Sequence, residues 1–159
     1  MFAIRLATAS DLEGVARLTR ELAEEFLIPE CTAEGAAELR KHFSLEGVHQ
    51  RFEAGFRHHV ALSGADLAGV IVMRENRHLL HLFVAKGHQS QGLARALWNV
   101  ARQACLDAGA SGEFTVNSSR GARGVYEAFG FVPQPETTVN GVPFIPMTLP
   151  AGAIAPLRR

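Results

Sequence analysis

The sequence predicts one α/β (α+β) domain over residues 1–159, with helices on both faces of a mixed, largely antiparallel sheet. Three observations predict this fold class. The apolar residues switch repeatedly between a helical period and the patterns of strands. Two tight turns join successive strands in the middle of the chain, which suits antiparallel pairing. Hydrophobic residues make up 47% of the 159 residues, enough to bury one core.

The N-terminal third predicts a strand followed by helices. Apolar residues alternate over residues 2–6, which is typical of a half-buried strand. Ser10, with Glu13 three residues later, predicts a capping box that opens a helix running to Pro29. A second helical stretch, from about 32 to about 56, contains three glycines, and we expect it to be broken.

The middle of the chain predicts three strands. Residues 59–62 and 67–73 flank the turn 63–66 and predict a hairpin. A second turn at 75–76 leads to the strand 78–84, His-Leu-Leu-His-Leu-Phe-Val. A run that is apolar on both faces predicts a position in the middle of the sheet.

The last third alternates helix and strand before it closes with a hairpin. A helix is expected from about Gln91 to Gly109, then a strand around 114–116 and a helix over 122–129, with Gly130 in the left-handed position after it. The expected order of elements is β-α-α-β-β-β-α-β-α-β-β.

The closing hairpin is predicted by Asn140-Gly141, a sequence typical of a type I′ turn. Pro143 and Pro146 follow in its second strand. Because proline donates no backbone hydrogen bond, we expect this strand to lie at an edge or to be interrupted.

Charge and cysteine content exclude several classes of protein. Lys plus Arg and Asp plus Glu both number 16, and without a basic surplus a nucleic-acid partner is not expected. No apolar run has the length of a membrane span, and Asp11 and Glu13 interrupt the pattern of a signal peptide. Cys31 and Cys105 are too few for a disulfide framework, and no spacing suits a metal site. We expect a cytoplasmic protein without membrane or metal partners.

The loop after the strand 78–84 could bind phosphate. A helix begins there with the small residues Gly92 and Ala94. The first turn of a helix exposes unpaired N–H groups and a partial positive charge, and small residues let an anion approach them. An ordinary strand-loop-helix connection explains the same residues.

Two motifs in these segments resemble those of the GNAT N-acetyltransferases. Gln89-Ser90-Gln91-Gly92-Leu93-Ala94 resembles the family's Q/R-x-x-G-x-G/A signature, which binds the pyrophosphate of acetyl-CoA. Val116-Asn117-Ser118-Ser119, Tyr126 and Gly130-Phe131 resemble its strand-helix unit ending in Tyr-x-x-x-Gly-Phe. The order of elements is also the family's, so the resemblance covers nearly the whole chain.

The resemblance implies a role for each matching residue. Tyr126 would direct its hydroxyl at the sulfur of acetyl-CoA, although its spacing also suits a core aromatic. Asn117 would contact the pantetheine or its surroundings. Val84 would lie along the pantetheine arm, where a bulge in the family's strand splays it from the next, and its N–H would stabilise the oxyanion. Backbone amides would bind the pyrophosphate at Gln89, Gln91, Gly92, Leu93, Ala94 and Arg95.

The general base is open between His78, His81 and a water relay. The two histidines are three residues apart, so we expect them to face opposite sides of a regular strand. His78 shares a face with the alternate residues up to Val84 and is therefore preferred. His58 and His59 could line the acceptor pocket, but a solvated strand end is the simpler explanation, and His42 is expected on a helix surface.

The resemblance implies an acetyl-CoA-dependent N-acetyltransferase that acts on a primary amine of a small molecule or protein. The acceptor would bind between the first two helices and the closing hairpin. Many members of the family are dimers, so a homodimer is also open. The alternative is a non-catalytic acyl-CoA-binding regulatory protein on the same fold, because fold alone does not fix function.

Overall fold

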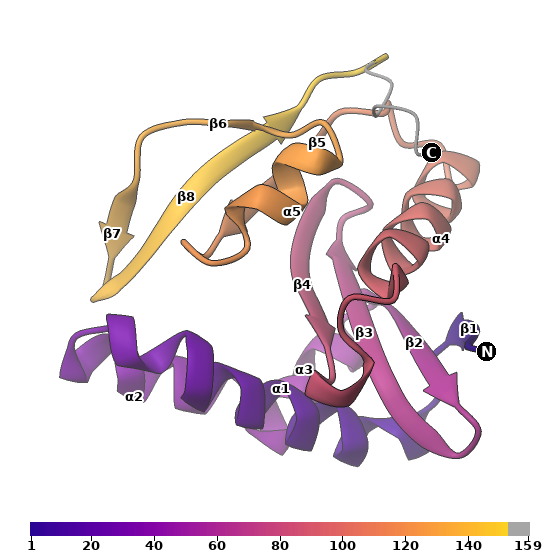
Figure 1. Cartoon of the computed structure of the whole chain (residues 1–159), viewed down its shortest axis with the longest axis horizontal. Helices are drawn as coiled ribbons and strands as arrows, with labels where there is room; N and C mark the ends of the chain where they lie inside the picture. Colours follow the sequence, from indigo (N-terminus) through magenta and orange to yellow (C-terminus); the bar gives the residue numbers. More distant parts are fainter. Residues whose placement is uncertain (153–159) are drawn as a thin grey trace.

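The computed structural model describes residues 1–152 and confirms the predicted mixed α/β fold (Figure 1). Its eight-stranded sheet has the order β1-β2-β3-β4-β5-β8-β6, with β7 paired to β8. All neighbours are antiparallel except β4 and β5, which are parallel. The strands are β1 (Ala3–Leu6), β2 (Arg57–Ser63), β3 (Asp66–Arg74), β4 (His78–Val84), β5 (Phe114–Ser118), β6 (Val132–Pro133), β7 (Thr137–Val139) and β8 (Val142–Leu149).

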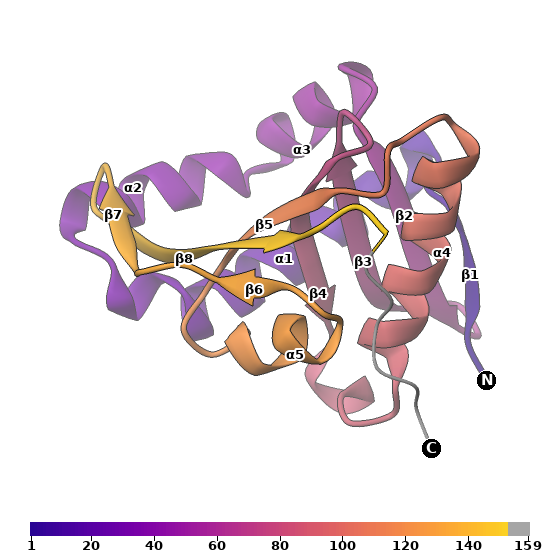
Figure 2. The same cartoon turned by 90° about the horizontal axis from the view of Figure 1, so that it is seen from above.

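Helices cover both faces of the sheet, as the sequence predicts. Helices α1, α2 and α3 lie on one side of the central strands and α4 on the other (Figures 1 and 2). The long stretch after α1 is broken into α2 and α3, each capped by a hydroxyl side chain. The helices are α1 (Leu12–Phe26), α2 (Ala33–His42), α3 (Leu45–Glu53), α4 (Leu93–Asp107) and α5 (Arg123–Ala128).

Two apolar clusters hold these layers together. The first joins the sheet to α4 and α5 around Trp98, whose ring packs edge-on against Phe114 and stacks on Phe129. The second joins α1 and α3 to the other face and is built on Leu12 and Val60, both fully buried. Burial of this apolar surface is the main stabilising term for the fold.

The start of α1 differs from the prediction. Thr8 and Asp11, and not Ser10 and Glu13, form the capping box, ahead of a short 3-10 turn over Ala9–Asp11. The Thr8 N–H donates to Asp11 Oδ2 over 2.7 Å, and Arg5 pairs with the same carboxylate, also over 2.7 Å. The ion pair to β1 fixes Asp11 as the capping residue, a contact that local spacing does not reveal.

The closing hairpin has the predicted turn but not the predicted edge position. Asn140 and Gly141 have φ values of 50° and 82°, as a type I′ turn requires. β8 is uninterrupted and pairs with β5 on one side and with β6 and β7 on the other. Its prolines contribute carbonyls: Pro146 O accepts from Gln134 N over 2.8 Å. The prediction of an edge position was wrong, because a proline lacks only the backbone N–H and its carbonyl can still accept a hydrogen bond from a neighbouring strand.

A bulge in β4 opens the sheet. Val72 of β3 lies opposite His81 and Met73 opposite Leu79, so Leu80 has no partner. The parallel pairing of β4 with β5 is confined to the residues before the bulge, His78 and Leu79. Beyond it the two strands separate, as the family resemblance implies.

Candidate active site

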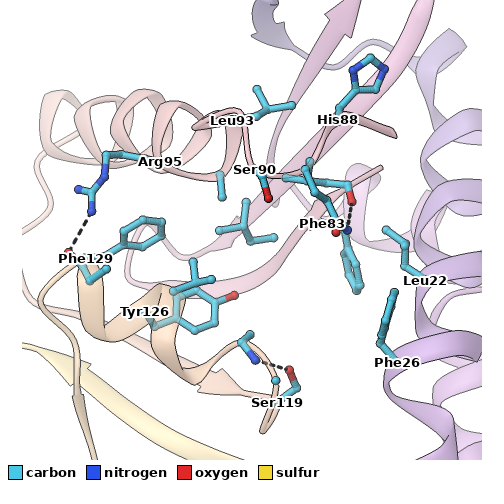
Figure 3. Close-up of a pocket in the computed structure, with 18 of the residues that line it drawn as sticks. Leu22, Phe26, Phe83, His88, Ser90, Leu93, Arg95, Ser119, Tyr126 and Phe129 are labelled. Atoms are coloured by element: carbon cyan, nitrogen blue, oxygen red, sulfur yellow. Dashed lines mark hydrogen bonds between the residues drawn. The ribbon is translucent and has the colours of Figure 1, made fainter. Parts of the chain in front are cut away.

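Two cavities meet in the opening between β4 and β5. The larger, of about 780 Å³, lies toward the start of α4 (Figure 3). The smaller, of about 270 Å³, lies toward α2 and the β7–β8 hairpin. Seven residues line both: Leu27, Glu30, Leu82, Phe83, Ser119, Ala122 and Tyr126.

The larger cavity contains the N-terminus of α4. The helix begins at Leu93, two residues later than predicted, because Gly92 takes the left-handed conformation at the N-cap with φ 77°. Gly92 has no side chain to cap the first turn, and a Cβ built there meets nothing within 4 Å. Ser90 is also left-handed, with φ 63°. The loop therefore leaves open space in front of backbone N–H groups and the positive end of the helix dipole.

Most of the predicted cofactor residues are brought together here. The larger cavity is lined by Val84, Gln89, Gly92, Leu93, Ala94 and Arg95. Gln91 does not line either cavity, and Asn117 lines the smaller one. The Arg95 guanidinium donates to Ala128 O over 3.1 Å and lies 5.1 Å from the Phe129 ring centroid, so it ties α4 to α5 (Figure 3).

The backbone of Val84 faces the opening. Ala85 N donates to Ala68 O over 2.8 Å, and Val84 lies opposite Gly69. Hydrogen-bonded and non-bonded pairs alternate along an antiparallel ladder, so the N–H and C=O of Val84 point away from β3. The Val84 carbonyl accepts from Gln89 Nε2 over 3.1 Å, and its N–H is directed to the gap left by β5.

Tyr126 belongs to the core and to both cavities. Its ring makes edge contacts with Phe129 and Phe131, and the residue is 6% exposed. Figure 3 shows the hydroxyl directed into the larger cavity, and it makes no hydrogen bond to other residues in 1–152. Burial raises the pKa of this hydroxyl, so it remains protonated at neutral pH.

The histidines of β4 lie differently with respect to the cavities. His81 and Phe83 are two residues apart on the same face of β4, and their ring centroids are 5.9 Å apart. His81 lines the smaller cavity, whereas His78 lines neither and bonds Thr115 Oγ1 through Nδ1 over 2.7 Å.

The prediction that His78 and His81 face opposite sides is wrong. The residues flanking Thr115 on β5 belong to the cluster under α4, so Thr115 and the His78 ring bonded to it lie on the other face, with His81. Burial lowers the pKa of His78 to about 4 and that of His81 well below its usual value.

His42, expected on a helix surface, is part of the site. Its Nε2 lies 2.7 Å from His81 Nε2, and Arg51 Nη1 lies 3.2 Å from its Nδ1. Burial, followed by the charge of Arg51, lowers the pKa of His42 to about 4, and burial lowers the pKa of Arg51 to about 10. No periodic pattern predicts this contact, because it joins the end of α2 to the middle of β4.

Two further histidines lie inside the fold. His58 and His59 are 3% and 5% exposed and line neither cavity, so the expected solvated strand end is wrong. The His58 ring packs against Phe52 of α3, with ring centroids 5.7 Å apart, and its Nδ1 bonds Phe56 O over 2.8 Å.

The wall of the smaller cavity combines distant segments of the chain. Residues of α2 and of the β7–β8 hairpin line it, as the resemblance implies for an acceptor site. Thr32 N, before α2, donates to Gly141 O at the hairpin turn over 3.0 Å. An anionic ligand at the start of α4 and a second reactant in the smaller cavity would meet at Tyr126.

Residues 1–152 contain neither a membrane-spanning helix nor a metal-binding cluster. None of their helices is long and apolar enough to cross a membrane. No group of three His, Cys, Asp or Glu side chains in this part of the chain could hold a metal ion.

Comparison with solved structures identifies the fold. A GCN5-related N-acetyltransferase from Rhodopseudomonas palustris superposes with a TM-score of 0.78 at 18% identity, covering 92% of this chain and 93% of that one. The PaiA N-acetyltransferase from Thermoplasma acidophilum, solved with coenzyme A, gives 0.73 at 19% identity, covering 93% and 98%. The protein yncA from Salmonella typhimurium, solved with acetyl-CoA, gives 0.67 at 15%, covering 99% and 98%.

Comparison of sequences identifies the family. No curated protein matched the chain. The family model described as the acetyltransferase (GNAT) domain matches residues 27–151, which include both sequence motifs, the lining of the smaller cavity and that of the larger one except Leu22 and Phe26. The chain belongs to the GNAT acetyltransferase family.

Proposed function

We propose that the chain, acting as a single domain, is an acetyl-CoA-dependent N-acetyltransferase that acts on a primary amine of a small molecule or protein. The observation that carries this proposal is the position of Tyr126, which lines both cavities where β4 and β5 separate. Acetyl-CoA enters through the larger cavity, and the amine enters through the smaller one.

The larger cavity suits an elongated ligand with an anionic diphosphate and an apolar arm. Backbone amides at Gly92, Leu93 and Ala94 bind the diphosphate, because the uncapped helix start offers donors and positive potential. The pantetheine arm follows Val84, whose outward N–H and C=O pair with amide groups in the manner of an added strand. Bound there, acetyl-CoA supplies the acyl group as an activated thioester.

The chain's residues stabilise the charges that develop during transfer. The amine lone pair attacks the carbonyl carbon, forming the C–N bond, and the oxyanion accepts from the Val84 N–H. When the C–S bond breaks, Tyr126 protonates the thiolate. The proton lost by the amine leaves through His81 or a water relay and is replaced on Tyr126 from solvent. His78 is not assigned this role, because Thr115 holds it outside both cavities.

The test is thiol release from acetyl-CoA in the presence of a panel of primary amines. We expect free CoA together with an acetylated amine identified by mass, for at least one class of acceptor. Calorimetric titration with CoA measures cofactor binding in the same preparation. Saturable CoA binding without thiol release for any amine would instead identify a non-catalytic acyl-CoA-binding protein.

A further inference from the structure

The smaller cavity contains a histidine whose proton position is set by its neighbours. A guanidinium group has only donors, so Arg51 Nη1 donates to His42 Nδ1, 3.2 Å away. Arg51 is held in place by a second hydrogen bond, from Nη2 to His42 O over 2.7 Å. His42 Nδ1 is therefore an acceptor without a proton.

The tautomer of His42 in turn determines the tautomer of His81. Burial and the charge of Arg51 keep the His42 ring neutral at pH 7, so its single proton lies on Nε2. That N–H donates to His81 Nε2 over 2.7 Å, which makes His81 Nε2 the acceptor. Burial keeps His81 neutral as well, so its proton lies on Nδ1. If His81 Nε2 donated to His42 Nε2 instead, the proton of the neutral His42 ring would lie on Nδ1. Two donors, Arg51 Nη1 and His42 Nδ1, would then face each other.

His81 Nδ1 is a polar atom left for a ligand, beside Asn117 and Tyr126 in the same lining. His81 is 7% exposed and lines the smaller cavity, and Nδ1 bonds no other residue in the described part of the chain. The lining is otherwise mainly apolar, with aromatic rings at Phe43 and Phe144. Glu30 is the one acidic residue among those that line it, and it lies at an exposed position.

We propose that His81 Nδ1–H donates a hydrogen bond to a carbonyl or carboxylate oxygen beside the acceptor's amine, and that the acceptor carries an apolar side chain. Apolar α-amino acids, their amides and peptide N-termini share this chemistry. The inference rests on the proposed function and names the substrate class of the same site. Arg51 and His42 are positioning residues, because they fix the tautomer of His81 without touching the acceptor.

The proposal has a consequence for proton transfer. In this tautomer His81 presents an N–H to the cavity and no lone pair, so it cannot accept the amine's proton there. The positive charge of Arg51 behind the two rings also favours an oxygen ligand over an ammonium group. The proton therefore leaves through water.

The tautomer is tested directly by NMR of protein labelled with ¹⁵N-histidine. Long-range proton–nitrogen correlation distinguishes protonated from unprotonated ring nitrogens, and the His81 signals are assigned by their loss in His81→Gln. We expect Nδ1 to be protonated and Nε2 unprotonated. In Arg51→Met the Nε2–H form of His81 becomes populated, whereas Arg17→Met, the same change at an exposed arginine of α1, leaves the spectrum unchanged. A proton on Nε2 in the wild-type protein would overturn the proposal.

The acceptor class is tested by titrating three amines against the same His81 signals, which requires no turnover. Phenylalanine and phenylalaninamide carry the oxygen, and phenethylamine lacks it. An unmet buried donor costs about a factor of ten or more in affinity, so the first two should bind at least tenfold more tightly. The ratio of these affinities to that of phenethylamine should fall toward one in Arg51→Met and stay unchanged in Arg17→Met.

Equal affinities for the three amines, or binding of none, would overturn the acceptor class. Failure of the proposed function has a different signature, since it appears as absent CoA release in the thiol assay. An acceptor preference can therefore stand even if no turnover is found.

Discussion

Replacing Tyr126 by Phe tests the catalytic assignment with little disturbance to the fold. The ring contacts with Phe129 and Phe131 are kept, and only a hydroxyl that bonds no residue in 1–152 is removed. We therefore expect the free energy of unfolding to change by less than about 1 kcal/mol. A positioned general acid contributes about 10²–10⁴ in rate, or about 3–5 kcal/mol of activation free energy, and kcat should fall by that factor.

The assays are thiol release for kcat, calorimetry for the Kd of CoA, and urea unfolding for stability. The Kd of CoA should stay within about twofold, because the proposed complex has this hydroxyl only at the sulfur end of the ligand. At pH values up to about 10, the rate of the wild-type enzyme should also show no decrease from loss of the Tyr126 proton, because the raised pKa of Tyr126 keeps this acid protonated. An unchanged kcat, or parallel losses of stability, affinity and rate, would refute the catalytic reasoning.

Three other perturbations test the cavities and the buried histidines. Gly92→Glu should weaken CoA binding more than 100-fold in calorimetry, because its side chain and charge enter the diphosphate space. Gly64→Glu, also left-handed (φ 62°) and in open space but in the β2–β3 turn, should keep the affinity; equal loss in both would contradict the loop assignment. Gly35→Ala should raise the KM of the amine while leaving the Kd of CoA unchanged, because its Cβ would overlap the carbonyl of Gly141; a rise in both would place the effect elsewhere. Urea unfolding should show stability that is full above pH 6.5 and falls toward pH 4, by about 3 kcal/mol for His42 and by less for the more accessible His78, because their folded pKa values lie below the unfolded ones. Constant stability across that range would show that these rings are not neutral and buried.

The parts of the fold that the sequence predicts are those with local causes. The left-handed conformations at Asn140-Gly141 and at Gly130 after α5 follow from the backbone preferences of these residues, and the structure has both. Helix α4 follows from apolar residues at helical spacing, of which Leu93, Leu97 and Ala101 are buried while Val100 is exposed. The candidate cofactor loop is predicted because helix entry, small residues and a family motif coincide within residues 89–94.

The parts that sequence reasoning missed depend on contacts between distant segments. A single unpaired residue, Leu80, places His78 on the face of His81 instead of the opposite one, and no residue type marks it as a bulge. His42 reaches His81 only because α2 ends against the sheet, 39 residues away in sequence. Asp11 caps its helix because Arg5 from β1 holds it there. The roles of the side chains around the smaller cavity could therefore be assigned only from the tertiary structure.

The close approach of Gly35 to Gly141 affects how this protein can change. The two segments that enclose the smaller cavity are clamped backbone to backbone, so their side chains are not needed to hold them together. Leu39 and Phe144 line this cavity without belonging to the clamp, so we expect their exchange to change which acceptor the cavity admits. The loop at Gly92 belongs to a separate stretch of the chain. Acceptor choice can thus diversify in evolution, or be redesigned in the laboratory, while the machinery for the acyl donor stays constant.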